Sequence, residues 1–133
     1  MFQVTDLQLA VLRELWRRGE GSVADVHAAL KQERGLATTT VATLLSRLEK
    51  RGLVCHRSEG RKHIYRASVS EPEVQTALLD SVTDGVFGGD VTALVSHLLE
   101  ARDMSSGDLA AVQKILARMQ AQEQQEDPET RDA

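Results

Sequence analysis

The sequence predicts a mostly α-helical protein with one small β-hairpin, and two patterns lead to this fold class. Six segments place apolar residues three or four positions apart, which is the spacing of one face of an α-helix. Between the third and fourth of these segments, residues 53–58 and 61–66 are rich in β-favouring side chains and flank a turn signal at Glu59 and Gly60. We therefore expect three helices, a hairpin and three further helices, in that order.

The first two helices are predicted by the residues at their ends. Thr5 and Gln8 have the spacing of a capping box, in which both side chains satisfy backbone N–H groups at a helix start, and Gly19 is a natural stop. Ser22 and Asp25 give a second start of the same kind. The first helix should therefore begin after residue 5 and the second after residue 22.

The third helix has the clearest apolar face. We expect Thr38 to cap its start and Gly52 to follow its end. The opposite face is polar and should be exposed. The predicted core residues of this helix are Val41, Leu44, Leu45 and Leu48, at positions i, i+3, i+4 and i+7.

A two-residue turn at Glu59 and Gly60 sets the predicted register of the hairpin. It places Arg57 opposite Lys62. Like charges directly opposite each other destabilise a strand pair, and a phosphate backbone nearby would offset that cost. The hairpin is therefore expected to contact an anionic partner.

The last three helices are predicted in the same way. Ser70 and Glu73 form a capping signal with a proline in the first turn, and Asp90 caps the next helix after a hinge at residues 85–89. Ser105 and Asp108 open the last helix. From residue 120 the chain is rich in Gln and Glu, and we expect it to fray.

Charge divides the 133 residues into two parts. Residues 1–70 carry 12 Lys and Arg against 7 Asp and Glu, whereas residues 71–133 carry 4 against 13. This asymmetry predicts an anionic partner for the first part and a protein contact or a solvated tail for the second. We assign a first domain to residues 1–70, a helical dimerisation domain to 71–122 and a flexible acidic tail to 123–133.

Several classes of protein are excluded. Apolar runs are only a few residues long, far below the roughly 20 that a membrane helix requires. The start of the chain does not resemble a signal peptide, and Cys55 has no second cysteine to form a disulfide. Motifs of hydrolases, zinc proteases and phosphate-binding loops are absent from the sequence. We expect a cytoplasmic protein that is not an enzyme and needs no metal or other cofactor.

Three helices followed by a basic hairpin form the layout of a winged helix-turn-helix, which binds double-stranded DNA. Short hydroxyl side chains let the third helix enter the major groove, where Arg47 can pair with guanine. Thr40 rather than Thr38 is expected to reach the DNA. The predicted DNA-binding residues are Thr39, Thr40, Thr43, Arg47, Lys50, Arg51, Arg57, Arg61 and Lys62.

The acidic part carries apolar residues at helical spacing on its last two helices. A partner subunit would cover these faces, so we expect a homodimer. The predicted dimerisation residues are Leu94, Val95, Leu98, Leu99, Leu109, Val112, Leu116 and Met119.

Residues 40–52, TVATLLSRLEKRG, resemble the penicillinase-repressor family of transcriptional regulators, as do Trp16 and the Gly60, Arg61 and Tyr65 pattern of the hairpin. The resemblance runs from about residue 5 to residue 119. It implies a homodimer that represses transcription by binding a palindromic operator. The positions matching groove-facing residues of the family are Thr39, Thr40, Thr43 and Arg47, while Ala42 departs from relatives that carry a long basic side chain there.

The resemblance also implies a way to relieve repression. In some members of the family a membrane sensor metalloprotease triggers cleavage of the repressor at an Asn-Phe bond. The matching positions here hold His97 and Leu98, so this candidate cleavage site has a different sequence. We expect any proteolytic break to fall within residues 94–104, and insertion of this chain into the membrane is not implied.

Two histidine arrangements raise the question of a metal site. The predicted register places His56 opposite His63, but Cys55 alternates to the other face and no fourth ligand follows at zinc spacing. His97 and Glu100 lie at i and i+3 on the fifth helix, which is more typical of a solvated pair. We expect no metal at either place.

A second function remains open at this point. Winged helices also serve as protein-interaction modules, because a fold does not by itself define a function. In that alternative the basic part would bind a protein and the acidic part would only oligomerise.

Overall fold

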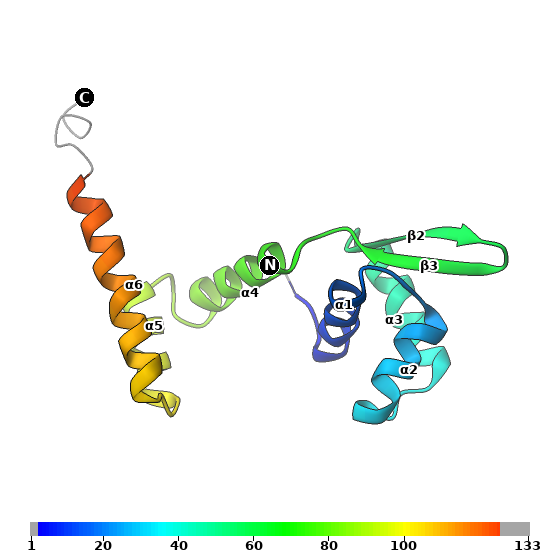
Figure 1. Ribbon diagram of the computed structural model, residues 1–133, viewed down its shortest axis with the longest axis horizontal. Helices are drawn as coiled ribbons and strands as arrows, with labels where there is room; N and C mark the ends of the chain where they lie inside the picture. Colours follow the sequence, from blue (N-terminus) through cyan, green and yellow to red (C-terminus); the bar gives the residue numbers. More distant parts are fainter. Residues whose placement is uncertain (1–2, 126–133) are drawn as a thin grey trace. The chain divides into compact units, whose positions relative to one another are not determined.

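The computed structural model describes residues 3–125, in which six helices and three strands form (Figure 1). The predicted order of helices and hairpin is confirmed. None of the described helices is both long and apolar enough to cross a lipid bilayer. The elements are α1 (Asp6–Arg18), β1 (Gly21–Ser22), α2 (Val23–Arg34), α3 (Thr38–Lys50), β2 (Val54–Glu59), β3 (Lys62–Ala67), α4 (Glu71–Gly85), α5 (Val91–Ala101) and α6 (Ser106–Gln125).

The chain forms two compact units, residues 1–89 and 90–133. The boundary expected at residue 70 therefore falls inside the first unit. Two observations place residues 69–85 with the first unit. Val74 of α4 is buried, and Trp16 Nε1 of α1 donates a hydrogen bond of 2.9 Å to the Val69 carbonyl just before α4. α4 consequently belongs with the first unit.

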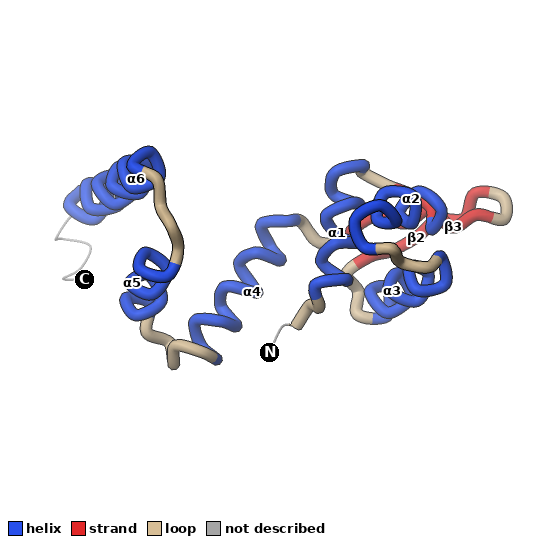
Figure 2. Tube along the Cα trace, turned by 90° about the horizontal axis from the view of Figure 1, so that it is seen from below, coloured by secondary structure: helices blue, strands red, loops and turns tan. Residues whose placement is uncertain are grey.

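The core of the first unit lies between α1, α2, α3 and the base of the hairpin. Figure 2 shows these helices clustered at one end of the hairpin, whose tip projects beyond them. All four apolar residues predicted for the inner face of α3 are buried. The fully buried side chains of largest volume are Leu12, Leu15, Leu45, Leu48, Val11, Val26, Val41 and Val54.

The hairpin belongs to a three-stranded antiparallel sheet with the order β1-β3-β2. Strand β1 was not predicted, because two residues are too few to show the alternation of a strand. Gly21 pairs with Tyr65 and Ser22 with Ile64. Ser22 therefore has two functions, since its side chain also caps α2.

The predicted register of the hairpin is wrong by two residues. Glu59 pairs with Lys62, so the loop consists of Gly60 and Arg61 rather than Glu59 and Gly60. Gly60 has a φ of +62°, a conformation that glycine adopts readily. The shift brings Arg57 opposite Ile64, and the expected like-charge pair does not form.

The start of α3 also differs from the prediction. Ala37, with extended backbone, occupies the N-cap position and makes no side-chain hydrogen bond there. The Val41 amide donates to the Ala37 carbonyl, so the helix begins one residue earlier than expected and Thr38 lies in its first turn. Thr38 is therefore not the cap.

The other predicted caps are confirmed. The Thr5 hydroxyl accepts a hydrogen bond of 3.1 Å from the Gln8 amide, and the Gln8 side chain accepts one from the Thr5 amide. Such a cap stabilises a helix by about 1 kcal/mol because it satisfies N–H groups that lack a partner within the helix. The other capping side chains are those of Ser22, Ser70, Asp90 and Ser105.

The second unit contains α5 and α6. No residue of either helix is buried in the single chain, although both carry apolar residues at helical spacing. α6 continues to Gln125, so residues 120–125, which we expected to fray, are helical, including residues 123–125 of the predicted tail. Residues 126–133, where we also expected a flexible tail, lie outside the described part.

Candidate DNA-binding surface

The outer face of α3 carries four of the predicted DNA-binding residues. Thr39, Thr43, Arg47 and Lys50 are exposed, while Thr40 is half-buried. The spacing of these residues places them on the side of the helix opposite its buried leucines. The structure thus leaves a polar ridge on α3 with short side chains toward its start and basic ones toward its end.

The hydroxyl of Thr43 is held by the helix itself. Its Oγ1 donates a hydrogen bond of 2.9 Å to the Thr39 carbonyl one turn earlier. This bond leaves the oxygen lone pairs and the methyl group of Thr43 available at the surface. A methyl group at this position can contact the methyl of a thymine, which is one of the features that distinguish base pairs in the major groove.

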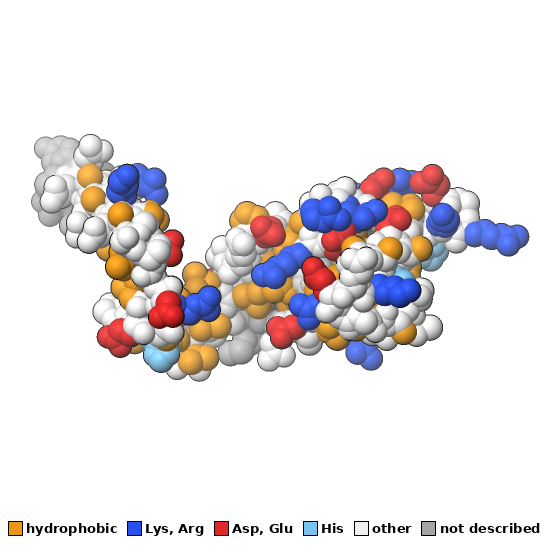
Figure 3. Space-filling model, turned by 60° about the horizontal axis from the view of Figure 1, so that its bottom comes forward, with side chains coloured by type: hydrophobic (Ala, Val, Ile, Leu, Met, Phe, Trp, Pro, Cys, Tyr) orange, Lys and Arg blue, Asp and Glu red, His pale blue; other side chains and the backbone are white. Residues whose placement is uncertain are grey.

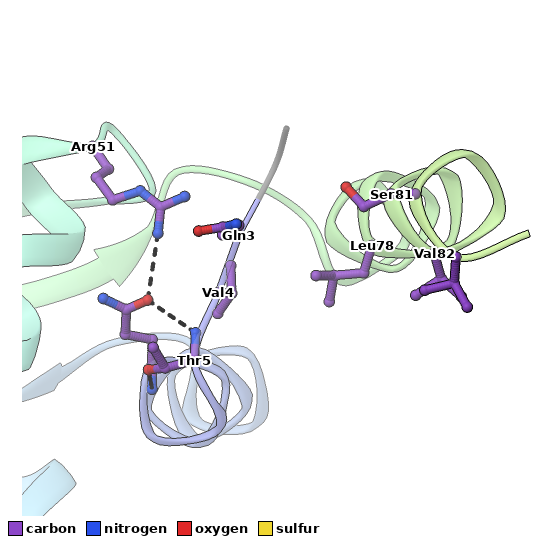
Figure 4. A pocket seen from close by; sticks show the side chains of 10 residues that line it. Gln3, Val4, Thr5, Arg51, Leu78, Ser81 and Val82 are labelled. Carbon is purple, nitrogen blue, oxygen red and sulfur yellow. Dashed lines mark hydrogen bonds between the residues drawn. The ribbon is translucent and has the colours of Figure 1, made fainter. Parts of the chain in front are cut away.

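Arg51 lies at the opposite end of α3 and faces a different part of the molecule. Its guanidinium donates a hydrogen bond of 3.3 Å to the Gln8 side chain of α1. Figure 4 shows Arg51 beside a groove of about 910 Å³ that Leu78 and Val82 of α4 border on the other side. Arg51 therefore contributes to the packing of α1 and the end of α3.

Arg57 is paired within the protein. Its guanidinium lies 2.8 Å from a carboxylate oxygen of Glu20 and 2.8 Å from one of Glu59. These hydrogen bonds raise the pKa of Arg57, the bond to Glu20 having the larger effect. The sequence did not indicate this arrangement, because Glu20 is distant in the chain and approaches only when β1 joins the sheet.

The basic residues at the tip of the hairpin extend from the protein (Figure 3). Arg61 and Lys62 are exposed and border a shallow depression of about 410 Å³ that also includes Ala42 of α3 and His63 of β3. The depression lies between the hairpin, α3 and the start of α2, where Ser22, Val23 and Ala24 also line it. We call the β2–β3 hairpin the wing.

A cluster of side chains connects α3 to the wing. The sequence placed its two histidines near each other but did not indicate the contact with Glu49. Glu49 Oε2 of α3 lies 2.5 Å from His56 Nδ1 of β2. The ring of His56 stacks on that of His63 at a centroid distance of 4.2 Å. Burial raises the pKa of the neighbouring Tyr65 hydroxyl, and the Glu49 carboxylate adds to this effect.

The two histidines are diagonal neighbours rather than a directly opposed pair, since His56 pairs with Tyr65 and His63 with Ser58. Among residues 3–125 no three His, Cys, Asp or Glu side chains are arranged to hold a metal ion. His97, on α5, is exposed.

Most of the predicted dimerisation residues are exposed in the single chain. Leu98 of α5 is 53% exposed and Met119 of α6 is 59% exposed, while Leu94 and Val112 are half-buried. Large apolar side chains at this exposure are unusual on two helices of one small unit. The candidate cleavage residues His97 and Leu98 lie within α5 and are both exposed.

The helix order, the exposed ridge of α3 and the basic wing together define a winged helix-turn-helix of the kind that contacts duplex DNA. Residues 4–118 match the model of the penicillinase repressor family. The chain belongs to this family of transcriptional regulators.

Individual relatives cover most of the chain. A transcriptional regulator BlaI of Mycobacterium tuberculosis is 35% identical over 87% of this chain and 84% of its own length. A penicillinase repressor of Bacillus licheniformis is 25% identical over 86% of this chain and 89% of its own. The solution structure of B. licheniformis BlaI as a monomer with the blaP half-operator is 28% identical and covers 54% of this chain and 88% of its own, with a TM-score of 0.48.

Proposed function

We propose that this protein is a homodimeric repressor that binds a two-fold symmetric DNA operator through α3 and the wing. The observation that carries the proposal is the exposed ridge of Thr39, Thr43, Arg47 and Lys50 on a helix whose other face is fully used by the core. Membership of a family of repressors supports it. The alternative function, a protein-interaction module, is supported by no comparable observation.

In this proposal α3 lies in the major groove. The threonines at its start allow close approach to the bases, and Arg47 reaches the O6 and N7 atoms of a guanine. Arg61 and Lys62 at the tip of the wing contact phosphates, which adds affinity without reading the sequence. Arg51 and Arg57, whose guanidiniums bond to Gln8 and to two glutamates, are weaker candidates for DNA contact.

The dimer forms through α5 and α6. Within residues 3–125, eleven large apolar side chains are exposed, and eight of these lie on the two helices of the second unit. Burying apolar area stabilises association by about 25 cal/mol per Å² before the costs of binding are subtracted. A second copy offers the same apolar faces, so a symmetric contact would cover both.

Selection from random DNA tests the proposal. The purified full-length protein is mixed with a pool of random duplexes, and the retained molecules are sequenced after several rounds. We expect two inverted half-sites with centres about one helical turn apart, because a symmetric dimer presents two α3 helices. If no sequence is enriched over the rounds and retention depends only on duplex length, sequence-specific binding is contradicted.

We further propose that proteolysis within α5 relieves repression, with a membrane sensor metalloprotease as the candidate partner. A break at His97 and Leu98 would divide α5 and separate α6 from the DNA-binding unit. We expect mass spectrometry of the protein from induced cells to show a break within residues 94–104. Intact protein in cells whose target promoter is active would instead indicate relief by a ligand or a metal.

A further inference from the structure

Glu49, His56, His63 and Tyr65 meet where α3 faces the wing. Glu49 and Ala42 lie seven residues apart on α3 and therefore share one face of the helix. Ala42 borders the same depression as His63 and Tyr65, and Glu49 contacts His56 directly. This side of α3 thus faces the two stacked imidazoles rather than the core.

The path of the DNA backbone would bring a phosphate strand over the surface between α3 and the wing, where His63 lies. One sugar-phosphate strand separates the major groove from the adjacent minor groove. If α3 lies in the major groove and the wing tip reaches the next groove, that strand must pass over the surface between them. His63 lies in this depression, next to Arg61 and Lys62.

We propose that His63 is a proton-linked phosphate contact, which takes up a proton as DNA binds while His56 beside it stays in contact with Glu49. This inference rests on the proposed function. Imidazole side chains as a class change charge between pH 5 and 8, so the coupling would operate near neutral pH.

The charges around His63 indicate why a phosphate would matter there. The rings of His56 and His63 lie 4.2 Å apart, and two positive rings at that distance repel each other. The Glu49 carboxylate contacts His56, and Arg61 lines the depression beside His63, while the Lys62 side chain alternates to the other face of the hairpin. The negative charge of a phosphate in the depression would offset both the repulsion between the rings and the charge of Arg61.

The other titratable groups near Glu49, His56 and His63 do not take up the proton in place of His63. Tyr65 stays neutral because burial raises its pKa. Asp25 at the start of α2 interacts with Lys62 and Arg18 rather than with the rings. The residues that alternate to the other face of the hairpin are Cys55, Arg57, Glu59, Lys62, Ile64 and Arg66.

Binding measured against pH tests the inference. Affinity of the full-length protein for the selected operator and for a random duplex of equal length is measured from pH 6 to pH 8 at constant ionic strength. Proton uptake on binding makes affinity rise as pH falls, and we expect a gain of about tenfold over this range on both duplexes. The gain should appear on random DNA because phosphates carry no sequence information.

Two variants separate this group from other histidines. His63→Gln keeps a polar side chain but cannot change charge, so its affinity should vary little with pH. His97→Gln removes an exposed histidine of α5 and should behave as the unchanged protein does. Calorimetry in two buffers of different ionisation enthalpy then counts the protons directly, with uptake expected for the unchanged protein and not for His63→Gln.

An equal pH dependence in His63→Gln and the unchanged protein would overturn the inference. So would the absence of proton uptake in calorimetry of the unchanged protein. Both outcomes leave specific operator binding intact, so they differ from failure of the proposed function, in which no operator is selected at any pH.

Discussion

Leu98→Asp is expected to convert the protein to a monomer and to weaken operator binding by about a hundredfold or more. Leu98 is 53% exposed in the single chain, so a charge there should not unfold the unit, but in a dimer it would be buried without a partner. When the dimer is lost, the second subunit's α3 is no longer held at a high local concentration near its half-site. Sedimentation and operator titration measure the two effects.

Ser96→Asp is the matched control. Ser96 lies two residues away on the same helix, is exposed and is polar already, so the same charge should change neither assembly nor affinity. Binding of Leu98→Asp to a duplex with one half-site should remain as strong as that of a monomeric unchanged protein. A dimeric Leu98→Asp protein with normal operator affinity would refute the assigned interface.

Arg47→Ala should weaken binding to the operator by about 1–3 kcal/mol and relax the preference for one base pair in each half-site. The guanidinium is exposed on the outer face of α3, and pairing with guanine is the contact that such a position favours. Binding to random DNA should change much less. Titrations on both duplexes at several salt concentrations measure this difference.

Arg61→Ala provides the comparison, because it removes one positive charge from the wing tip rather than from α3. It should lower affinity on operator and random DNA alike and reduce the dependence of affinity on salt by the equivalent of about one phosphate contact. If Arg47→Ala produced the same uniform loss, Arg47 would contact phosphate and not a base.

The helices and most of their caps could be predicted because their signals are local. A capping pair such as Thr5 and Gln8 lies within one turn of the helix it starts, and apolar spacing identifies the buried face directly. The exposed ridge of α3 follows from the same spacing. Even locally the prediction had limits, since Ala37 rather than Thr38 occupies the N-cap of α3.

The register of the wing shows where local signals become ambiguous. Glycine suits either position of a two-residue loop, so the sequence around Gly60 allowed two registers that differ by two residues. Both keep Tyr65 and His56 on the inner face, because strands alternate with a period of two. The opposite charges of Glu59 and Lys62, paired beside the loop, favour the observed one.

Patterns in the sequence were enough to predict the order of elements, the core of α3, the basic and acidic parts and the family. Packing of the folded chain was needed to add β1 to the sheet, to pair Arg57 with Glu20 and to bring Glu49 into contact with the stacked histidines. Spacing along the chain specifies only the neighbours on one helix or strand. Contacts between elements, such as Arg57 with Glu20, form only when the strands and helices pack together.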